Sequence, residues 1–299
     1  MGIFKRLQSE YGGFEQIENL IGSSILHKYT ESIYQQYCKK YTDATYMISV
    51  ESRLKHYHAS KKMILSALFY TQARYLVDHN AKNLSFYSMY YSLFSALSSN
   101  ILVLPSIDLL KVHSVSHGKL FDYIENYFVK LNIYNTTIIE LLNELRLMRE
   151  VYSYHLPLGG KFHHNKEVFN VDTMFERLSD FLPVIYKISD MLSYFSYYAW
   201  EKKSCHVKDL YHQHQTEVNS LFFSLIEHHD HKDKYCLIDD DDHRRQGYFL
   251  TKLSSPCPLS WTITEKLCED LECGWDEGSG VGYDINEVAQ YLASTTNAF

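Results

Sequence analysis

The sequence is poor in the residues that build tight turns. Only 12 of its 299 residues are glycine and only 5 are proline. A β-sandwich joins many short strands through turns that depend on these residue types. The composition therefore argues against an all-β fold.

Long hydrophobic segments are missing as well. The apolar stretches at 63–70 and 101–104 are far shorter than the ~20 residues that span a bilayer. The first residues, MGIFKRLQSEYGG, lack the hydrophobic stretch of a secretory signal. We therefore expect a cytoplasmic protein with no membrane partner and with reduced cysteines.

Positive charge is scarce at one end of the chain. Residues 205–299 contain 7 Lys and Arg against 17 Asp and Glu, a net charge of −10, whereas residues 1–204 carry +3. This contrast predicts a helical bundle at 1–204, with its core at about 60–200 and a helical extension at 1–59. An acidic region with many His and Cys follows at 205–299. The overall acidity argues against a nucleic-acid coat protein, but it permits RNA in a local pocket.

Aromatic and aliphatic residues are abundant and lie at helical spacing. The chain has 26 tyrosines and 16 phenylalanines, and apolar residues that recur every three to four positions predict amphipathic helices. We therefore predict an all-α bundle, followed by a small α+β or partly disordered appendage. The expected helices are short ones within 1–42, then 60–78, 84–102, one from Ser116, 136–155, and 173–200 with a capping box at Thr173 and a kink at Pro183. The appendage is expected to contain a helix at 207–227, strands at 235–238 and 247–253, and a last helix from Asp284 to Leu292.

Arg149 lies on the apolar face of the expected helix 136–155. On a helical wheel with about 100° per residue, it falls within roughly 20° of Ile138 and Leu142. An unpaired buried charge costs several kcal/mol. Arg149 therefore needs an acidic partner, an interface or a charged ligand.

His155 ends the same helix, about 120° round from Arg149 if the helix continues. A histidine at a helix C-terminus titrates near neutrality and can transfer protons, and an arginine can bind a phosphate. Together they would support phosphodiester cleavage without a metal or cofactor. The alternative is a purely structural pair, with Arg149 bound to a carboxylate of another helix.

Three segments, in the same order, resemble the HEPN family of bacterial and archaeal helical domains over about residues 60–200. Residues 85–103, SFYSMYYSLFSALSSNILV, are similar to the family's YYALFHAARALL helix. Residues 115–124, VSHGKLFDYI, are similar to its Ser-His helix start. Residues 146–155, RLMREVYSYH, match its arginine, polar residue and later histidine at Arg149, Glu150 and His155.

The resemblance implies a HEPN-like bundle that works as a metal-independent endoribonuclease. Active members pair two chains so that the Arg and His helices of both face one composite cleft. By this resemblance His155 would act as general acid and base, and Arg149 would stabilise the phosphorane. The implied partners are an RNA substrate, a second copy of the chain and a neutralising antitoxin or other regulatory partner.

Two positions depart from the family pattern. Glu150 stands where the family has Asn, Asp or His, and Pro157 stands where a subset inactivated by nucleotide addition has Tyr. Tyr152 and Tyr154 are candidate supporting residues, with packing as the alternative role for both. The leading hypothesis is a toxin or antiphage (abortive-infection) effector. The alternative is a non-catalytic HEPN-like module that binds RNA or a ligand or acts as an adaptor.

A metal site in the acidic region is the other candidate from the residues alone. Cys205, His206, His212 and His214 could ligate zinc, but their spacing differs from the usual C-x2-C and H-x3-5-H pairs. We therefore expect a solvated polar stretch and no metal.

Overall fold

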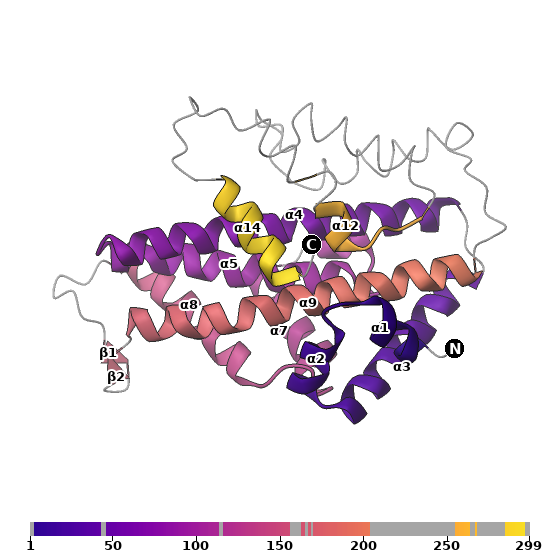
Figure 1. Cartoon of the computed structure of the whole chain (residues 1–299). Helices are drawn as coiled ribbons and strands as arrows, with labels where there is room; N and C mark the ends of the chain where they lie inside the picture. The colour runs from indigo at the N-terminus through magenta and orange to yellow at the C-terminus, as the bar shows by residue number, and fades with distance from the viewer. Residues whose placement is uncertain are drawn as a thin grey trace.

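The computed structural model describes residues 3–42, 46–113, 116–155, 163–164, 167–168, 170–203, 255–263, 267 and 285–296. Within these residues the fold is an all-α bundle, which confirms the predicted fold class (Figure 1). A pair of two-residue antiparallel strands, β1 (His163–His164) and β2 (Glu167–Val168), precedes the last long helix. The helices are α1 (Ile3–Glu10), α2 (Phe14–Ile21), α3 (Ser23–Thr42), α4 (Tyr46–Asp78), α5 (Lys82–Leu102), α6 (Leu109–His113), α7 (His117–Ile124), the π-helix η1 (Glu125–Val129), α8 (Thr137–Glu150), the π-helix η2 (Val151–His155), α9 (Val171–Lys203), α12 (Leu259–Thr262) and α14 (Ile285–Thr296).

Three long helices form the centre of the bundle. α4 and α5 make an antiparallel hairpin, and α9 packs along both (Figure 1). In the turn between α4 and α5, Asn80 has a left-handed backbone with a φ of 58°. Asparagine tolerates this conformation because its short polar side chain can bond locally. The break expected between the helices at 60–78 and 84–102 is therefore confirmed.

Serines let the central helices approach one another closely. Ser66 Oγ donates to the Ser92 carbonyl at 2.7 Å, and Ser92 Oγ donates to the Ser66 carbonyl at 2.9 Å. Tyr186 of α9 donates to Ser66 Oγ at 2.7 Å. All three side chains are buried. Each bond matters because an unsatisfied buried polar group costs about 1–3 kcal/mol.

The helix expected to begin at residue 60 begins at Tyr46 instead. Its first part contains Arg53, Lys55 and His56, which are 2–3% exposed. Buried polar residues break the apolar periodicity from which a helix is predicted. This explains why the sequence pattern misses the first turns of α4.

Lys55 shows how such a residue is accommodated. Its Nζ donates to the carbonyls of Leu104 and Ile107 at 2.6 and 2.5 Å. Burial lowers the pKa of Lys55 to about 7. The two carbonyls replace water and tie the chain after α5 to α4.

The N-terminus of α9 is capped by Asn170. Its Oδ1 accepts from the amides of residues 172 and 173 at 2.9 and 3.4 Å, satisfying amides that have no partner within the helix. The capping box expected at Thr173 is therefore wrong. The helix starts at Val171 and continues through Pro183 to Lys203.

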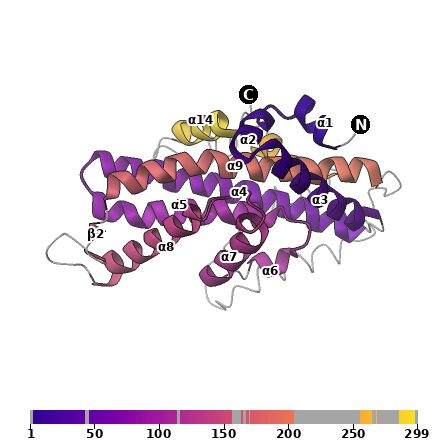
Figure 2. The same cartoon turned by 90° about the horizontal axis from the view of Figure 1, so that it is seen from below.

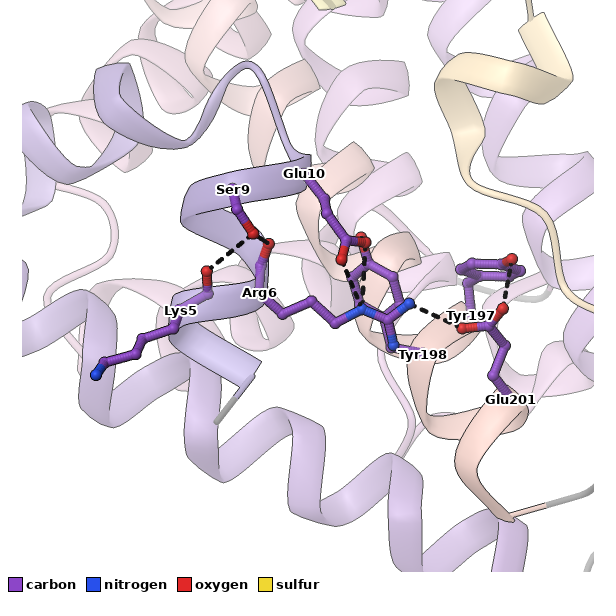
Figure 3. Close-up of polar contacts among 7 residues, drawn as sticks. All are labelled: Lys5, Arg6, Ser9, Glu10, Tyr197, Tyr198 and Glu201. Atoms are coloured by element: carbon purple, nitrogen blue, oxygen red, sulfur yellow. Dashed lines mark hydrogen bonds and ion pairs between the residues drawn. The ribbon is translucent and has the colours of Figure 1, made fainter. Parts of the chain in front are cut away.

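The N-terminal helices α1, α2 and α3 pack against α9. Arg6 of α1 lies between two acidic side chains, 3.1 Å from Glu10 and 3.1 Å from Glu201, with its guanidinium 3.8 Å above the Tyr198 ring (Figure 3). Tyr198 donates to Glu10 at 2.7 Å and so lowers the pKa of that carboxyl. Partly exposed ion pairs contribute at most about 1 kcal/mol each to stability. Their main effect is therefore on the orientation of α1, and they add little to the free energy of folding.

The helices α7 and α8 pack against α5 (Figure 2). The Oγ of Ser116 accepts from the Lys119 amide at 3.4 Å, so the helix start expected at Ser116 is confirmed. α8 buries Ile138, Leu142 and Leu145 completely. This confirms the apolar face on which Arg149 is placed.

Two short segments beyond residue 254 pack on α4 and α9, on the side of the bundle away from α7 and α8 (Figures 1 and 2). Asp190 Oδ1 accepts from the Ser260 amide at 2.9 Å, and the Cys257 carbonyl lies 2.6 Å from His56 Nδ1. Tyr291 of α14 stacks on Tyr70 at 4.4 Å. α14 covers the last helix expected from the sequence, whereas its expected cap Asp284 and the elements predicted at 207–253 lie outside the described residues.

No helix in the described part of the chain is both long and apolar enough to cross a membrane.

Candidate functional site

Arg149 lies almost at the end of α8, on its packed face. Its side chain is 12% exposed, compared with 42% for Arg146 one turn earlier. A guanidinium this deeply placed loses most of its contact with water. The surrounding side chains must therefore replace the hydration that it loses.

Two tyrosines of α5 form the surface on which Arg149 rests. The guanidinium carbon lies 4.7 Å from the centroid of the Tyr90 ring and 5.8 Å from that of Tyr91. Nη1 also donates to Tyr91 Oη at 3.2 Å. Cation–π contacts of this kind contribute about 0.5–2 kcal/mol. Neutral rings of α5, which are not among the partners expected from the sequence, thus contact the Arg149 guanidinium.

Glu150 supplies the acidic partner, and it lies on the same helix as Arg149. Its Oε1 accepts from Arg146 at 2.9 Å and from Arg149 Nη2 at 3.3 Å. Hydrogen bonding from Arg146 lowers the pKa of the Glu150 carboxyl below its usual value. One carboxylate is thus shared by two guanidinium groups, so these three described side chains together carry a net positive charge.

Arg149 keeps hydrogen-bonding capacity after these contacts. An arginine has five N–H donors, and the described residues accept two hydrogen bonds from this one. The spare donors and the net positive charge fit an anionic ligand. Phosphate suits this arrangement because a planar guanidinium can bind two of its oxygens at once.

The chain after Arg149 does not continue as an ordinary α-helix. Residues Val151–His155 form the π-helix η2, whose turns are wider than those of an α-helix. The angle of about 120° between Arg149 and His155 assumed an α-helix, so it does not apply. Single π turns occur frequently at functional sites. The backbone of His155 ends η2, and its side chain lies outside the described side chains.

Of the two candidate supporting tyrosines, Tyr152 and Tyr154, the structure describes the side chain of Tyr152. Tyr152 stacks on Phe86 of α5, with the ring centroids 5.3 Å apart and the planes 10° from parallel. This contact fits the packing role that was the alternative for Tyr152. The side chain of Tyr154 lies outside the described side chains.

His117 joins this cluster although the sequence motif does not include it. Its Nδ1 lies 2.5 Å from Tyr90 Oη, and its ring lies 5.6 and 6.5 Å from the rings of Tyr90 and Tyr91. Burial, followed by the positive charges of Arg149 and Arg146, lowers the pKa of His117. His117 is therefore largely neutral at neutral pH.

Sequence reasoning could not connect His117 with Arg149. The two belong to α7 and α8, and α5 brings them together because both lie against Tyr90. The available signal was the Ser-His helix start, which places His117 at the beginning of a helix and gives no contact with α8. Spacing along one helix carries no information about contacts between helices.

The metal candidates of the acidic region, Cys205, His206, His212 and His214, lie outside the described residues. In the portion that the structure describes, no three His, Cys, Asp or Glu side chains are grouped closely enough to hold a metal ion.

Comparison with known proteins gives no relative. No family model, no curated protein and no solved structure matches the chain.

Proposed function

We propose that the chain is a HEPN-type, metal-independent endoribonuclease that acts as a toxin or antiphage effector. The observation that carries this proposal is Arg149, a nearly buried guanidinium with spare donors and a net positive surrounding. The π turn that separates it from His155 adds support, because such turns are frequent at functional sites. The three segments that resemble the family support the same reading.

The proposed chemistry needs no group beyond the chain and the RNA. The 2′-oxygen attacks phosphorus, the bond from phosphorus to the 5′-oxygen breaks, and a cyclic phosphate and a 5′-hydroxyl result. His155 takes the proton of the 2′-hydroxyl and returns a proton to the 5′-oxygen. Arg149 stabilises the charge that develops on the phosphorane oxygens.

Expression of the wild-type chain tests this function directly. We expect growth arrest and degradation of cellular RNA. His155→Ala should reduce cleavage on the order of 10²–10⁴-fold, as expected when a general acid–base group is lost. Growth and the size distribution of total RNA measure both effects.

The control for this test is His27→Ala, which removes an exposed histidine of α3 and should cleave RNA like the wild type. The function is rejected if purified wild-type protein and His155→Ala leave RNA equally intact.

We also propose that the site is completed by a second copy of the chain. Leu84 and Tyr87 of α5 are 66% and 48% exposed, and the Tyr87 ring lies 4.6 Å from the Tyr91 ring. Large exposed apolar side chains beside a candidate site suit a protein interface. A partner chain on this surface would lie next to Arg149.

Negative charge introduced on this surface tests whether the protein forms the proposed dimer. The double variant Leu84→Glu and Tyr87→Glu should sediment as a monomer, because two carboxylates would be buried without partners. The wild type should sediment as a dimer at micromolar concentration. Leu131→Glu, at another exposed leucine (46%), serves as the control and should stay dimeric. A monomeric wild type contradicts the composite site.

The alternative is a non-catalytic module that binds RNA or acts as an adaptor. Glu150 favours it, because its carboxylate occupies one amino group of Arg149 and would repel a phosphate. The same purified protein distinguishes the two functions. Binding of RNA without cleavage, including by Glu150→Asn, would favour the module.

A further inference from the structure

His117 is held in one orientation by a buried tyrosine. Its Nδ1 is 2.5 Å from Tyr90 Oη, and Tyr90 is fully buried. Burial raises the pKa of Tyr90 to about 12, so the phenol keeps its proton at neutral pH. Among the described residues, Nδ1 is the only hydrogen-bond partner of that hydroxyl.

This single contact fixes the tautomer of His117. The described residues offer the proton of the buried Tyr90 hydroxyl no acceptor other than Nδ1, and an unpaired buried donor is costly. The hydroxyl therefore donates to Nδ1, which accepts and carries no hydrogen. A neutral imidazole carries one hydrogen, which therefore resides on Nε2. The described residues offer no acceptor to this Nε2–H, and His117 is only partly buried.

His117 lies close enough to Arg149 for the positive charge of that guanidinium to help lower the pKa of His117. Both side chains contact the same two rings, the guanidinium at 4.7 Å and the imidazole at 5.6 Å from the centroid of Tyr90. His117 comes from the first turn of α7, where the helix dipole favours a bound anion. The helices α7 and α8 thus each bring a side chain with hydrogen-bond donors to the same pair of tyrosines.

We propose that His117 is a phosphate-binding residue, whose Nε2–H donates a hydrogen bond to the phosphate group that the Arg149 guanidinium binds. The ligand class is a phosphate ester of a nucleotide. Tyr90 is a positioning residue. It does not contact the ligand, but its hydroxyl occupies Nδ1 of His117 and so leaves the Nε2–H to donate to the phosphate.

This inference adds a residue to the proposed active site. That the bound phosphate belongs to RNA rests on the proposed ribonuclease function. The phosphate would then be the one that is cleaved. A neutral N–H donor stabilises a non-bridging oxygen whose charge grows in the transition state. No proton leaves His117 in this step, so the proton balance of the reaction is unchanged.

Histidine NMR of the full-length protein tests the site without any need for activity. The Cε1–H signal of His117, one of 16 histidines, is assigned by its loss in His117→Gln. We expect added uridine 3′-monophosphate to shift this signal and to raise the pKa of His117, because a bound anion favours the imidazolium. Inorganic phosphate serves as the second probe, and a response to either probe supports the site.

Three variants give the test its controls. Arg149→Ala should abolish the response of the His117 signal. His117→Ala should weaken nucleotide binding about tenfold or more, and His117→Gln, which keeps a neutral N–H donor, should recover part of the loss. His79→Ala removes an exposed histidine at the end of α4 and should bind like the wild type.

Tyr90→Phe tests the tautomer. Loss of the hydroxyl frees Nδ1, so the two nitrogens should share the hydrogen, which ¹⁵N chemical shifts of the His117 ring report. A His117 signal that ignores both phosphates, or that responds equally in Arg149→Ala, overturns the inference.

The two proposals fail in different ways. If the wild type cleaves no RNA but His117 responds to phosphate through Arg149, the nuclease is rejected and the phosphate site stands. If RNA is cleaved and His117→Ala cleaves and binds like the wild type, the phosphate site is rejected and the nuclease stands.

Discussion

Replacement of Arg149 by alanine is expected to reduce RNA cleavage on the order of 10²–10³-fold, the loss typical of one preorganised transition-state donor. The Arg149 side chain is 12% exposed, and its guanidinium rests on Tyr90 and Tyr91. It is therefore held in place before the substrate arrives. Cleavage of a fluorescent RNA oligonucleotide by purified protein measures the effect.

A neighbouring arginine provides the matched control. Arg146 lies on the same helix, is 42% exposed and contacts the same carboxylate of Glu150. Arg146→Ala removes an equal charge and should lower cleavage far less, because this side chain lies at a more solvated edge. Equal losses in the two variants would mean that general positive charge, and no particular guanidinium, supports cleavage.

Arg149→Lys separates geometry from charge. Lysine keeps the positive charge but has no planar fork of donors. We expect it to recover little of the lost cleavage. The thermal unfolding of each variant shows whether the fold is retained, since loss of a buried contact also affects stability.

The second large effect concerns stability and involves Asp190 of α9. This carboxyl is fully buried. Oδ1 accepts from the Ser260 amide at 2.9 Å, whereas Oδ2 has no hydrogen-bond partner in the described part of the chain. Burial raises the pKa of Asp190 from its usual value of 3.8 to about 7.

A raised pKa in the folded state sets the sign of the pH dependence. Below about pH 3.8 the carboxyl is neutral in both states, and its contribution to stability is fully present. As the pH rises to about 7, the unfolded chain releases the proton more readily and this stability is lost. The loss reaches at most about 4 kcal/mol, at 1.36 kcal/mol per pKa unit.

Asp190→Asn should therefore become more stable relative to the wild type as the pH rises from 4 to 7. The free energy of unfolding in urea, measured at several pH values, gives this difference. The variant should also lose some stability at every pH, because its amide nitrogen would replace Oδ2 and be buried without a hydrogen-bond partner among the described residues. Asp180→Asn, at an exposed position of the same helix, should show no such trend. A constant difference between Asp190→Asn and the wild type contradicts the buried, titrating carboxyl.

Much of the helical core could be predicted from apolar spacing. α5 and α8 follow the expected segments closely, because apolar residues recur at helical spacing in each. The start of α4 could not be predicted, since Arg53, Lys55 and His56 are buried there. Their burial depends on partners such as the Leu104 and Ile107 carbonyls, which lie about fifty residues away.

Docking of the chain beyond residue 254 could not be predicted either. Asp190 is one of several acidic residues of α9. Its carboxyl accepts from Ser193 Oγ of the same helix and from the Ser260 amide, which lies 70 residues further along the chain. The position of Asp190 in the helix gives no sign of which distant segment will cover it.

The sequence by itself determined the helical fold and the position of Arg149 on the buried face of α8, because both follow from local periodicity. Only the tertiary structure decided what Arg149 meets: the rings of Tyr90 and Tyr91, the shared carboxylate of Glu150 and, across Tyr90, His117. The reason is that side chains of α7 and α8 become neighbours only when both helices pack on α5. Periodicity identifies the apolar face of a single helix. Which residues of other helices that face contacts is decided only when the helices pack together.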